Sequence, residues 1–272
     1  RSDPMAHILL PTDFGHHALN ACAYALDLYG SEGHVYTLVH TYVDPLPGYA
    51  QVVEMSSAYY TTSVEDLAHF AERFRGLPGG ANAQVFTVVE YGPMTAALQV
   101  LCERKQVDVI VMGTQGVSGL HLFGSNAAAM AKASPVPVLI VPKDAQYNGL
   151  RHILLADDLR SAEPTAMAFL VELARRTGAQ FTLAHVARTD DERPDPWSLA
   201  EMDDLLGEVP YTWTEVRDDD VAQALSTLAE RQQMDLVAVL HRHTGFLDGL
   251  FHASVAKQLA MHSRIPLLVL EQ

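Results

Sequence analysis

The chain has 272 residues, of which 49% are hydrophobic and 19% are charged. This balance is typical of a folded globular protein, and the length favours two domains over one. Lys and Arg number 18 against 33 Asp and Glu, which gives a net charge of −15 and excludes nucleic-acid binding through a broad basic face. No apolar run approaches the roughly 20 residues that span a bilayer, and no signal peptide is recognisable, so we expect a cytoplasmic protein without membrane contact.

The second half of the chain repeats the first. Three motifs return in the same order: HILLPTD (His7–Asp13) as HILLADD (His152–Asp158), VDVIVM (Val107–Met112) as MDLVAV (Met234–Val239), and PVPVLIV (Pro135–Val141) as RIPLLVL (Arg264–Leu270). A duplication of this kind decides the architecture. We therefore predict two homologous domains, residues 5–143 and 151–272, joined by a short polar link.

Within each half, short β-branched runs alternate with segments of helical period. The first half predicts strands at Ile8–Pro11, Val35–His40, Gln84–Glu90, Val107–Met112 and Val136–Val141, and helices at His17–Tyr29, Ser63–Arg75, Met94–Lys105 and Asn126–Ala133. The second half predicts strands at Ile153–Ala156, Phe181–Val186, Tyr211–Val216, Leu236–Leu240 and Leu267–Leu270. This alternation predicts an α/β fold with a parallel sheet covered by helices on both faces.

Glycine and polar residues follow the strands of the first half. Pro11-Thr12-Asp13 end the first strand, His40-Thr41 end the second, Met112–Gly116 (MGTQG) end the fourth, and Gly124-Ser125-Asn126 open the last helix. Ligands of open parallel sheets bind at the carboxyl ends of the strands, and glycines before a helix N-terminus suit phosphate. A phosphate site is one interpretation; a plain turn with Ser125 as N-cap is the other.

Taken together, the motifs ILLPTDF, VHTY, VDVIVMGTQGVSGL, FGSNAAAM and PVPVLIVP resemble the universal stress protein family, and the repeat makes the chain similar to its tandem members. The resemblance implies two Rossmann-like domains, each with a five-stranded parallel sheet of order 3-2-1-4-5, which pair through their last strands. It also implies binding of ATP, ADP or AMP, with or without Mg²⁺.

The resemblance assigns ten residues to the nucleotide site. Those around the adenosine are Pro11, Asp13, Thr41, Met112 and Gly113, and those at the phosphates are Gln115, Gly116, Gly124, Ser125 and Asn126. Two features depart from the family pattern. Seven residues, Val117–Phe123, separate Gly116 from Gly124 where the family has nine, and Thr41 replaces the usual apolar residue.

The second half has lost this motif. The alignment puts Leu240 in the place of Gly113, His243 in the place of Gly116, and Ala253-Ser254 in the place of Gly124-Ser125. Leucine and histidine side chains would fill the space that phosphates need. We therefore expect a degenerate site in the second domain.

The remaining polar clusters have ordinary explanations. His241, His243, His252 and His262 lack a carboxylate or cysteine partner set, so no metal site is predicted. Asp218–Asp220 precede a predicted helix and are expected to cap it. No catalytic dyad is recognisable, so any ATP hydrolysis should be slow. Cys22 and Cys102 are interpreted as buried, and Gly48–Thr62 as a cover of the site, a partner surface or a helix lead-in.

The leading hypothesis is a stress-response regulatory protein whose N-terminal domain binds an adenine nucleotide and whose chains can form a homodimer. A nucleotide-independent interaction protein, with both sites vestigial, is the alternative. A slow ATP-hydrolysing enzyme is a third.

Overall fold

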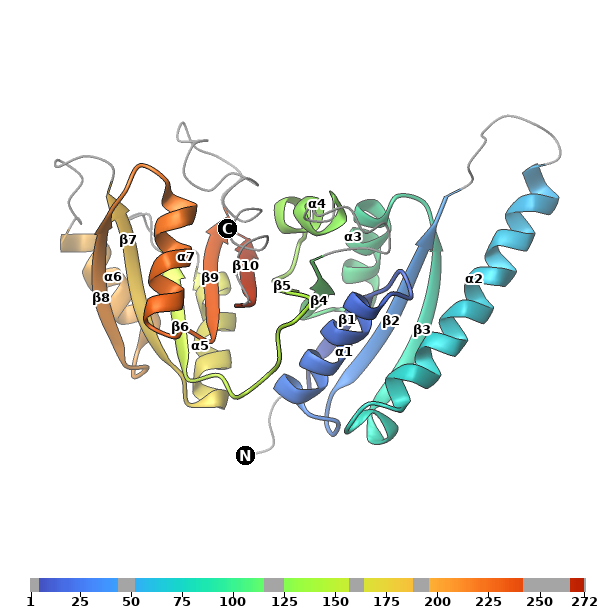
Figure 1. Cartoon of the computed structure of the whole chain (residues 1–272), viewed down its shortest axis with the longest axis horizontal. Helices are drawn as coiled ribbons and strands as arrows, with labels where there is room; N and C mark the ends of the chain where they lie inside the picture. The colour runs from blue at the N-terminus through green and yellow to red at the C-terminus, as the bar shows by residue number, and fades with distance from the viewer. Residues whose placement is uncertain are drawn as a thin grey trace. The chain divides into compact units, whose positions relative to one another are not determined.

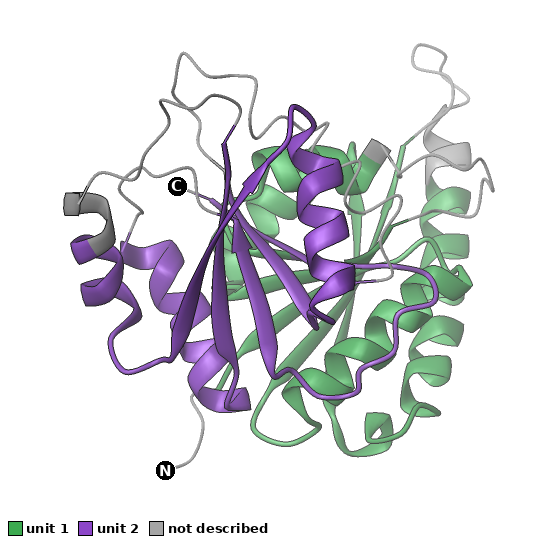
Figure 2. Ribbon diagram, turned by 60° about the vertical axis from the view of Figure 1, so that its left-hand side comes forward, with its two compact units in different colours: residues 1–138 green, residues 139–272 purple. Residues whose placement is uncertain are grey.

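The computed structural model of the chain describes residues 5–43, 52–114, 125–156, 164–187, 196–241 and 265–271. The chain divides into two compact units, residues 1–138 and 139–272 (Figure 2). Strands and helices alternate through both halves, and neighbouring strands such as β1 and β2 or β9 and β10 run parallel. The predicted tandem α/β fold is therefore confirmed.

The first half carries five strands and its helices lie on both faces of them. The elements are β1 (His7–Pro11), α1 (His16–Tyr29), β2 (Val35–Tyr42), α2 (Val52–Arg75), the short 3₁₀ helix η1 (Gly80–Asn82), β3 (Gln84–Tyr91), α3 (Met94–Lys105), β4 (Val109–Gly113), α4 (Ser125–Ala133) and β5 (Val138–Val141). The strand order is β3-β2-β1-β4-β5, the predicted 3-2-1-4-5. Helices α1 and α2 cover one face, and α3 and α4 cover the other (Figure 1).

The second half repeats this plan. Its elements are β6 (His152–Ala156), α5 (Pro164–Thr177), β7 (Gln180–Ala187), α6 (Pro196–Leu206), β8 (Tyr211–Arg217), α7 (Val221–Arg231), β9 (Leu236–His241) and β10 (Leu267–Glu271). The order β10-β9-β6-β7-β8 is the same sequence of strands read from the other edge. The carboxylate of Asp220 accepts a hydrogen bond from the Gln223 N–H at 3.1 Å, which confirms it as the cap of α7.

Several predicted boundaries differ from the observed ones by two residues or more. Strand β2 ends at Tyr42 and not at His40, and β5 begins at Val138 and not at Val136. Helix α2 begins at Val52 and not at Ser63, because the residues between them contain no glycine or proline to stop a helix. Strand β4 begins at Val109 and not at Val107, because Asp108 is engaged in another contact.

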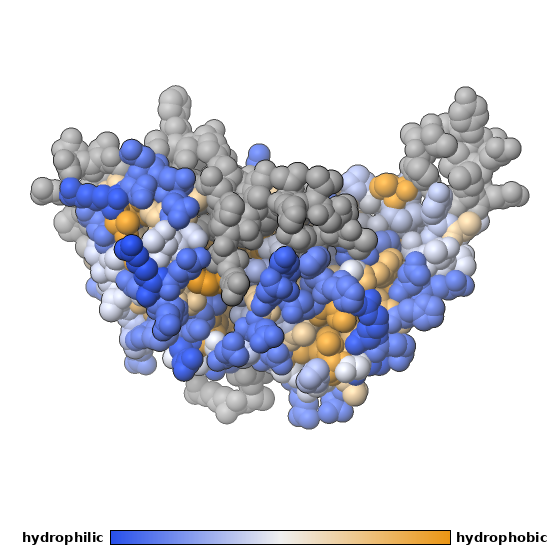
Figure 3. Space-filling view, in the orientation of Figure 1, coloured by the Kyte–Doolittle hydropathy of each residue, from blue (hydrophilic) through white to orange (hydrophobic). Residues whose placement is uncertain are grey.

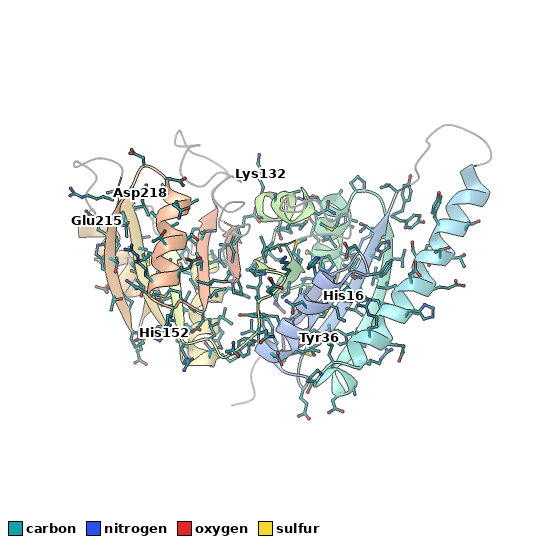
Figure 4. The ribbon with its side chains drawn as sticks, in the orientation of Figure 1. His16, Tyr36, Lys132, His152, Glu215 and Asp218 are labelled. Carbon is teal, nitrogen blue, oxygen red and sulfur yellow. The ribbon has the colours of Figure 1, made fainter. Side chains whose placement is uncertain are left out.

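That contact occurs in both halves, between two of the repeated sequence motifs. The Asp108 carboxylate accepts from the His7 backbone N–H at 2.7 Å, and the Asp108 N–H donates to the His7 carbonyl at 3.0 Å. Asp235 makes the same reciprocal pair with His152, both at 2.9 Å. The pairs join the starts of neighbouring strands, at the amino end where Figure 4 labels His152. We refer to them as the aspartate clamps, and they stabilise the sheet far from the carboxyl ends.

Both cysteines are buried, as expected from the sequence. Burial raises the pKa of the Cys102 thiol to about 11 and raises that of Cys22 further. Thiols with raised pKa values are poor nucleophiles at neutral pH. The two cysteines therefore belong to the core.

Candidate functional site

The strands that carry the predicted site residues are neighbours in register. Pro11 of β1 lies opposite Val39 of β2, and Leu9 of β1 lies opposite Ile110 of β4. Asp13 follows Pro11 by two residues, Thr41 follows Val39 by two within β2, and Met112 follows Ile110 by two within β4. The structure therefore brings the ends of β1, β2 and β4 to one edge, where ligands of such sheets bind.

Asp13 lies in the loop that joins β1 to α1. Its carboxylate accepts a hydrogen bond from the Gly15 N–H at 3.0 Å, and the Thr12 hydroxyl accepts one from the Phe14 N–H at 2.8 Å. Both bonds satisfy backbone donors just before α1, whose N-cap residue, Gly15, makes no side-chain bond to the first turn. The side chains of Asp13 and Thr12 thus both stabilise the conformation of this loop.

Phe14 is held in an unusual conformation by residues from β2 and α2. Its φ of 67° lies in the left-handed region, which aromatic residues rarely adopt. The centres of the His40 and Phe14 rings lie 4.3 Å apart, and His40 Nδ1 lies 2.8 Å from the Thr12 carbonyl oxygen. Arg73 donates to the Phe14 carbonyl at 2.7 Å. Three contacts therefore lock the loop beside the site.

Gly113 ends β4 against the first turn of α1. A Cβ atom added to it would lie 2.8 Å from the carbonyl oxygen of His17 and 3.0 Å from its carbonyl carbon. Real Cβ atoms do not come so close to a backbone, so glycine is required by helix packing whatever binds nearby. Met112 is buried in the core beside it. Neither residue needs a ligand to explain it.

The phosphate side of the predicted site is described only in part. Ser125 is the first residue of α4 and Asn126 is the second, with an exposed side chain. A helix N-terminus of this kind presents unpaired N–H groups and the positive end of the dipole. Gln115, Gly116 and Gly124 lie outside the described residues.

The second half has different residues at the carboxyl ends of its own strands. Leu240, in the place of Gly113, is buried within β9. His185 corresponds to His40 by the repeat, and its ring stacks on Trp213 at 6.4 Å. Asp158, His243, Ala253 and Ser254 lie outside the described residues, as do His252 and His262.

Among the residues that the structure describes, there is no group of three or more His, Cys, Asp or Glu side chains that could hold a metal ion. None of the helices described is both long and apolar enough to cross a membrane.

Sequence reasoning missed the residues that hold the Phe14 loop. The VHTY motif contains His40, but nothing in the sequence indicated that its ring would pack on Phe14. Arg73 lies 59 residues from Phe14 along the chain, and its guanidinium also sits 5.3 Å from the centre of the Phe70 ring. Only the docking of α2 on β2 brings these groups together.

Solved structures of other proteins are similar to this chain over almost its whole length or over half of it. A universal stress protein from Archaeoglobus fulgidus DSM 4304 is 17% identical, covers 97% of this chain and 98% of its own, and superposes with a TM-score of 0.76. For a putative universal stress protein from Pseudomonas aeruginosa UCBPP-PA14 the values are 11%, 98%, 93% and 0.59. A universal stress protein in complex with cAMP matches 50% of this chain and 96% of its own, with 21% identity and a TM-score of 0.37. A comparison with curated proteins found no match.

The family comparison agrees with the internal repeat. The model of the universal stress protein family matches residues 5–142 and matches again over residues 149–271. The two matches cover both copies of the repeated motifs and the strands of both halves. The chain therefore belongs to the universal stress protein family and carries two of its domains in tandem.

Proposed function

We propose that the N-terminal domain binds an adenine nucleotide, ATP, ADP or AMP, and that the C-terminal domain has a degenerate site. Nucleotide occupancy would act as a signal in a stress-response regulatory protein, because a ligand that prefers one state shifts the population toward it. The observation that carries the proposal is the convergence of Asp13, Thr41 and the end of β4 at one sheet edge.

The adenosine is assigned to the loop after β1 and to the end of β2. Asp13 and Thr41 supply the polar groups there, and the locked Phe14 loop keeps Asp13 in place without a ligand. Preorganisation of this kind reduces the entropy that binding must overcome. Pro11 and the backbone of Met112 and Gly113 complete this side of the proposed site.

The phosphates are assigned to the N-terminus of α4. Gln115, Gly116, Gly124, Ser125 and Asn126 are the proposed contacts, and Mg²⁺ would be held through the phosphates rather than by a protein cage. The helix N-terminus offers partial positive charge to a phosphate in a chain whose net charge is −15.

Calorimetric titration with ATP, ADP and AMP tests the proposal. We expect binding by the native chain and at least about tenfold weaker ATP binding by Asn126→Asp, because the new carboxylate faces the phosphates. The fold should tolerate this change, since Asn126 is exposed and an acidic residue suits the first turn of a helix.

Thr165→Asp is the matched control. Thr165 is exposed and lies in the first turn of α5, so it adds the same charge at a helix N-terminus in the other half. ATP affinity should not change in this variant. Equal losses in both variants would argue for a general charge effect and against a phosphate site at α4.

A nucleotide-independent interaction protein is the second candidate, and Gly113 is the observation that favours it. Packing against His17 alone requires a glycine there, so this residue would persist in a site that no longer binds nucleotide. Absence of heat with all three nucleotides would support this candidate and reject the first.

A further inference from the structure

Exposed apolar side chains gather around one edge of the first half. Within the described part of the chain, six of the eight large exposed hydrophobic residues lie in α2, in β3 or directly after β2: Val43, Tyr59, Tyr60, Val64, Phe86 and Tyr91. On the face that Figure 3 shows, apolar areas lie among hydrophilic ones over the elements of unit 1. Clusters of this kind mark interaction surfaces.

Aromatic contacts connect these residues across three elements. The Tyr42 ring lies 5.5 Å from that of Tyr91 and 6.3 Å from that of Tyr60. Tyr60 is 49% exposed and Tyr91 61%, so each offers a large free surface. Phe86, 48% exposed, is five residues before Tyr91 and therefore points to the opposite face of the sheet. The apolar groups thus flank β3 on both sides.

Strand β3 is the last strand of its sheet in the first half, paired with β2 alone. Its outer edge presents backbone N–H and C=O groups that can pair with another strand. The sequence QVFTVVEY contains no proline, lysine or arginine, and Glu90 is its one charge. We call β3 together with the six exposed residues above the β3 edge surface.

The second half provides an internal comparison. The repeat aligns Thr37 with Thr182, and these pair with Phe86 of β3 and Thr212 of β8. In the same way Tyr42 pairs with Tyr91, whereas Ala187 pairs with Arg217. Each exposed aromatic residue of β3 is therefore a polar or charged residue on β8.

Strand β8 shows the usual protection of an edge. Arg217 lies 3.5 Å from Glu215 in an ion pair, and Asp218 follows directly (Figure 4). Charges at an edge strand prevent association with other strands. The fold is duplicated in this chain, and its edge strand carries these charges in the second half, on β8, but not in the first half, on β3.

We propose that the β3 edge surface binds a second copy of this chain, with the two β3 strands antiparallel. The net charge of −15 opposes self-association over most of the molecule. Two copies can approach through a face that is nearly uncharged on both, and this surface meets that requirement. An antiparallel pair also places the two Glu90 side chains at opposite ends of the ribbon.

Charge repulsion defines a second property of this dimer. Glu65 and Asp66 are exposed on α2 directly after Val64, at the border of the surface. Salt screens repulsion between such exposed groups while apolar contacts persist. The dimer should therefore become tighter as the NaCl concentration rises.

Sedimentation velocity of the full chain over a range of concentrations tests the proposal. We expect a reversible dimer. The dissociation constant of Phe86→Lys should be at least about tenfold higher than that of the native chain, because a lysine must then be desolvated at the contact. Thr212→Lys, at the corresponding position of β8, should dimerise like the native chain. Val64→Glu probes the helix side of the surface and should weaken the dimer without a change in β3.

Hydrogen exchange identifies the strand. Amides of β3 should exchange more slowly as the protein concentration rises, and those of β8 should not change. A native chain that is monomeric up to about 100 μM, far above the micromolar range of weak specific interfaces, would overturn the proposal and leave the surface to a different protein. Equal weakening by Phe86→Lys and Thr212→Lys, or protection without involvement of β3, would overturn it as well.

Discussion

Replacing Gly113 with alanine tests whether helix packing is what requires this glycine. The added Cβ would lie 2.8 Å from the His17 carbonyl oxygen, which is backbone and cannot rotate away. Overpacking of this kind typically costs about 1–3 kcal/mol. Alanine also restricts the unfolded chain, which offsets about 0.4–1 kcal/mol where the native conformation allows it. We therefore expect a net loss of stability for the first half.

Gly76→Ala is the matched control. A Cβ there would lie 3.4 Å from the nearest atom, the Arg73 carbonyl oxygen, which is ordinary contact. This variant should be as stable as the native chain or slightly more stable. The difference between the two variants then isolates the contact between Gly113 and α1.

Urea unfolding followed by two signals assigns the loss to the correct half. Circular dichroism reports both halves, whereas the two tryptophans, Trp197 and Trp213, lie in residues 139–272. We expect Gly113→Ala to lower the circular dichroism midpoint and to change the tryptophan transition less. If Gly113→Ala is as stable as Gly76→Ala, packing against His17 does not require the glycine, and the reasoning fails.

Two further predictions concern the clamps and the thiols. Asp108→Ala should lower the free energy of unfolding by about 1 kcal/mol, since it removes the acceptor of the His7 N–H, whereas Asp27→Ala, at an exposed position of α1, should have little effect in the same urea titration. The raised pKa of Cys102 means that the folded state holds this proton more tightly, so its contribution to stability is present below about pH 9 and is lost as the pH rises through about 11. Thermal melts across this interval should show a shallower decline for Cys102→Ala than for the native chain; parallel declines would contradict the assignment.

The sequence by itself determined the duplication, the alternation of strands and helices, and therefore the parallel sheet in each half. These follow from local patterns, because apolar runs and helical periods reflect burial of each element along the chain. The repeat extends even to the backbone. Gln106 and Gln233 both adopt positive φ, at 51° and 53°, and each lies two residues before the aspartate of its clamp. The ten candidate site residues were chosen from family resemblance, and their role in nucleotide binding stays a prediction.

Only the tertiary structure decided what the individual residues contact. That Gly113 meets the His17 backbone depends on how closely α1 packs on β4, a distance that no local pattern encodes. The lock on Phe14 needs α2 and β2 at the same place, although Arg73 is remote in sequence. The contrast between β3 and β8 appears only once the strand register of each half shows that Phe86 and Thr212 occupy corresponding positions. Packing distance, long-range contact and register are properties of assembled elements, and for that reason sequence patterns did not reveal them.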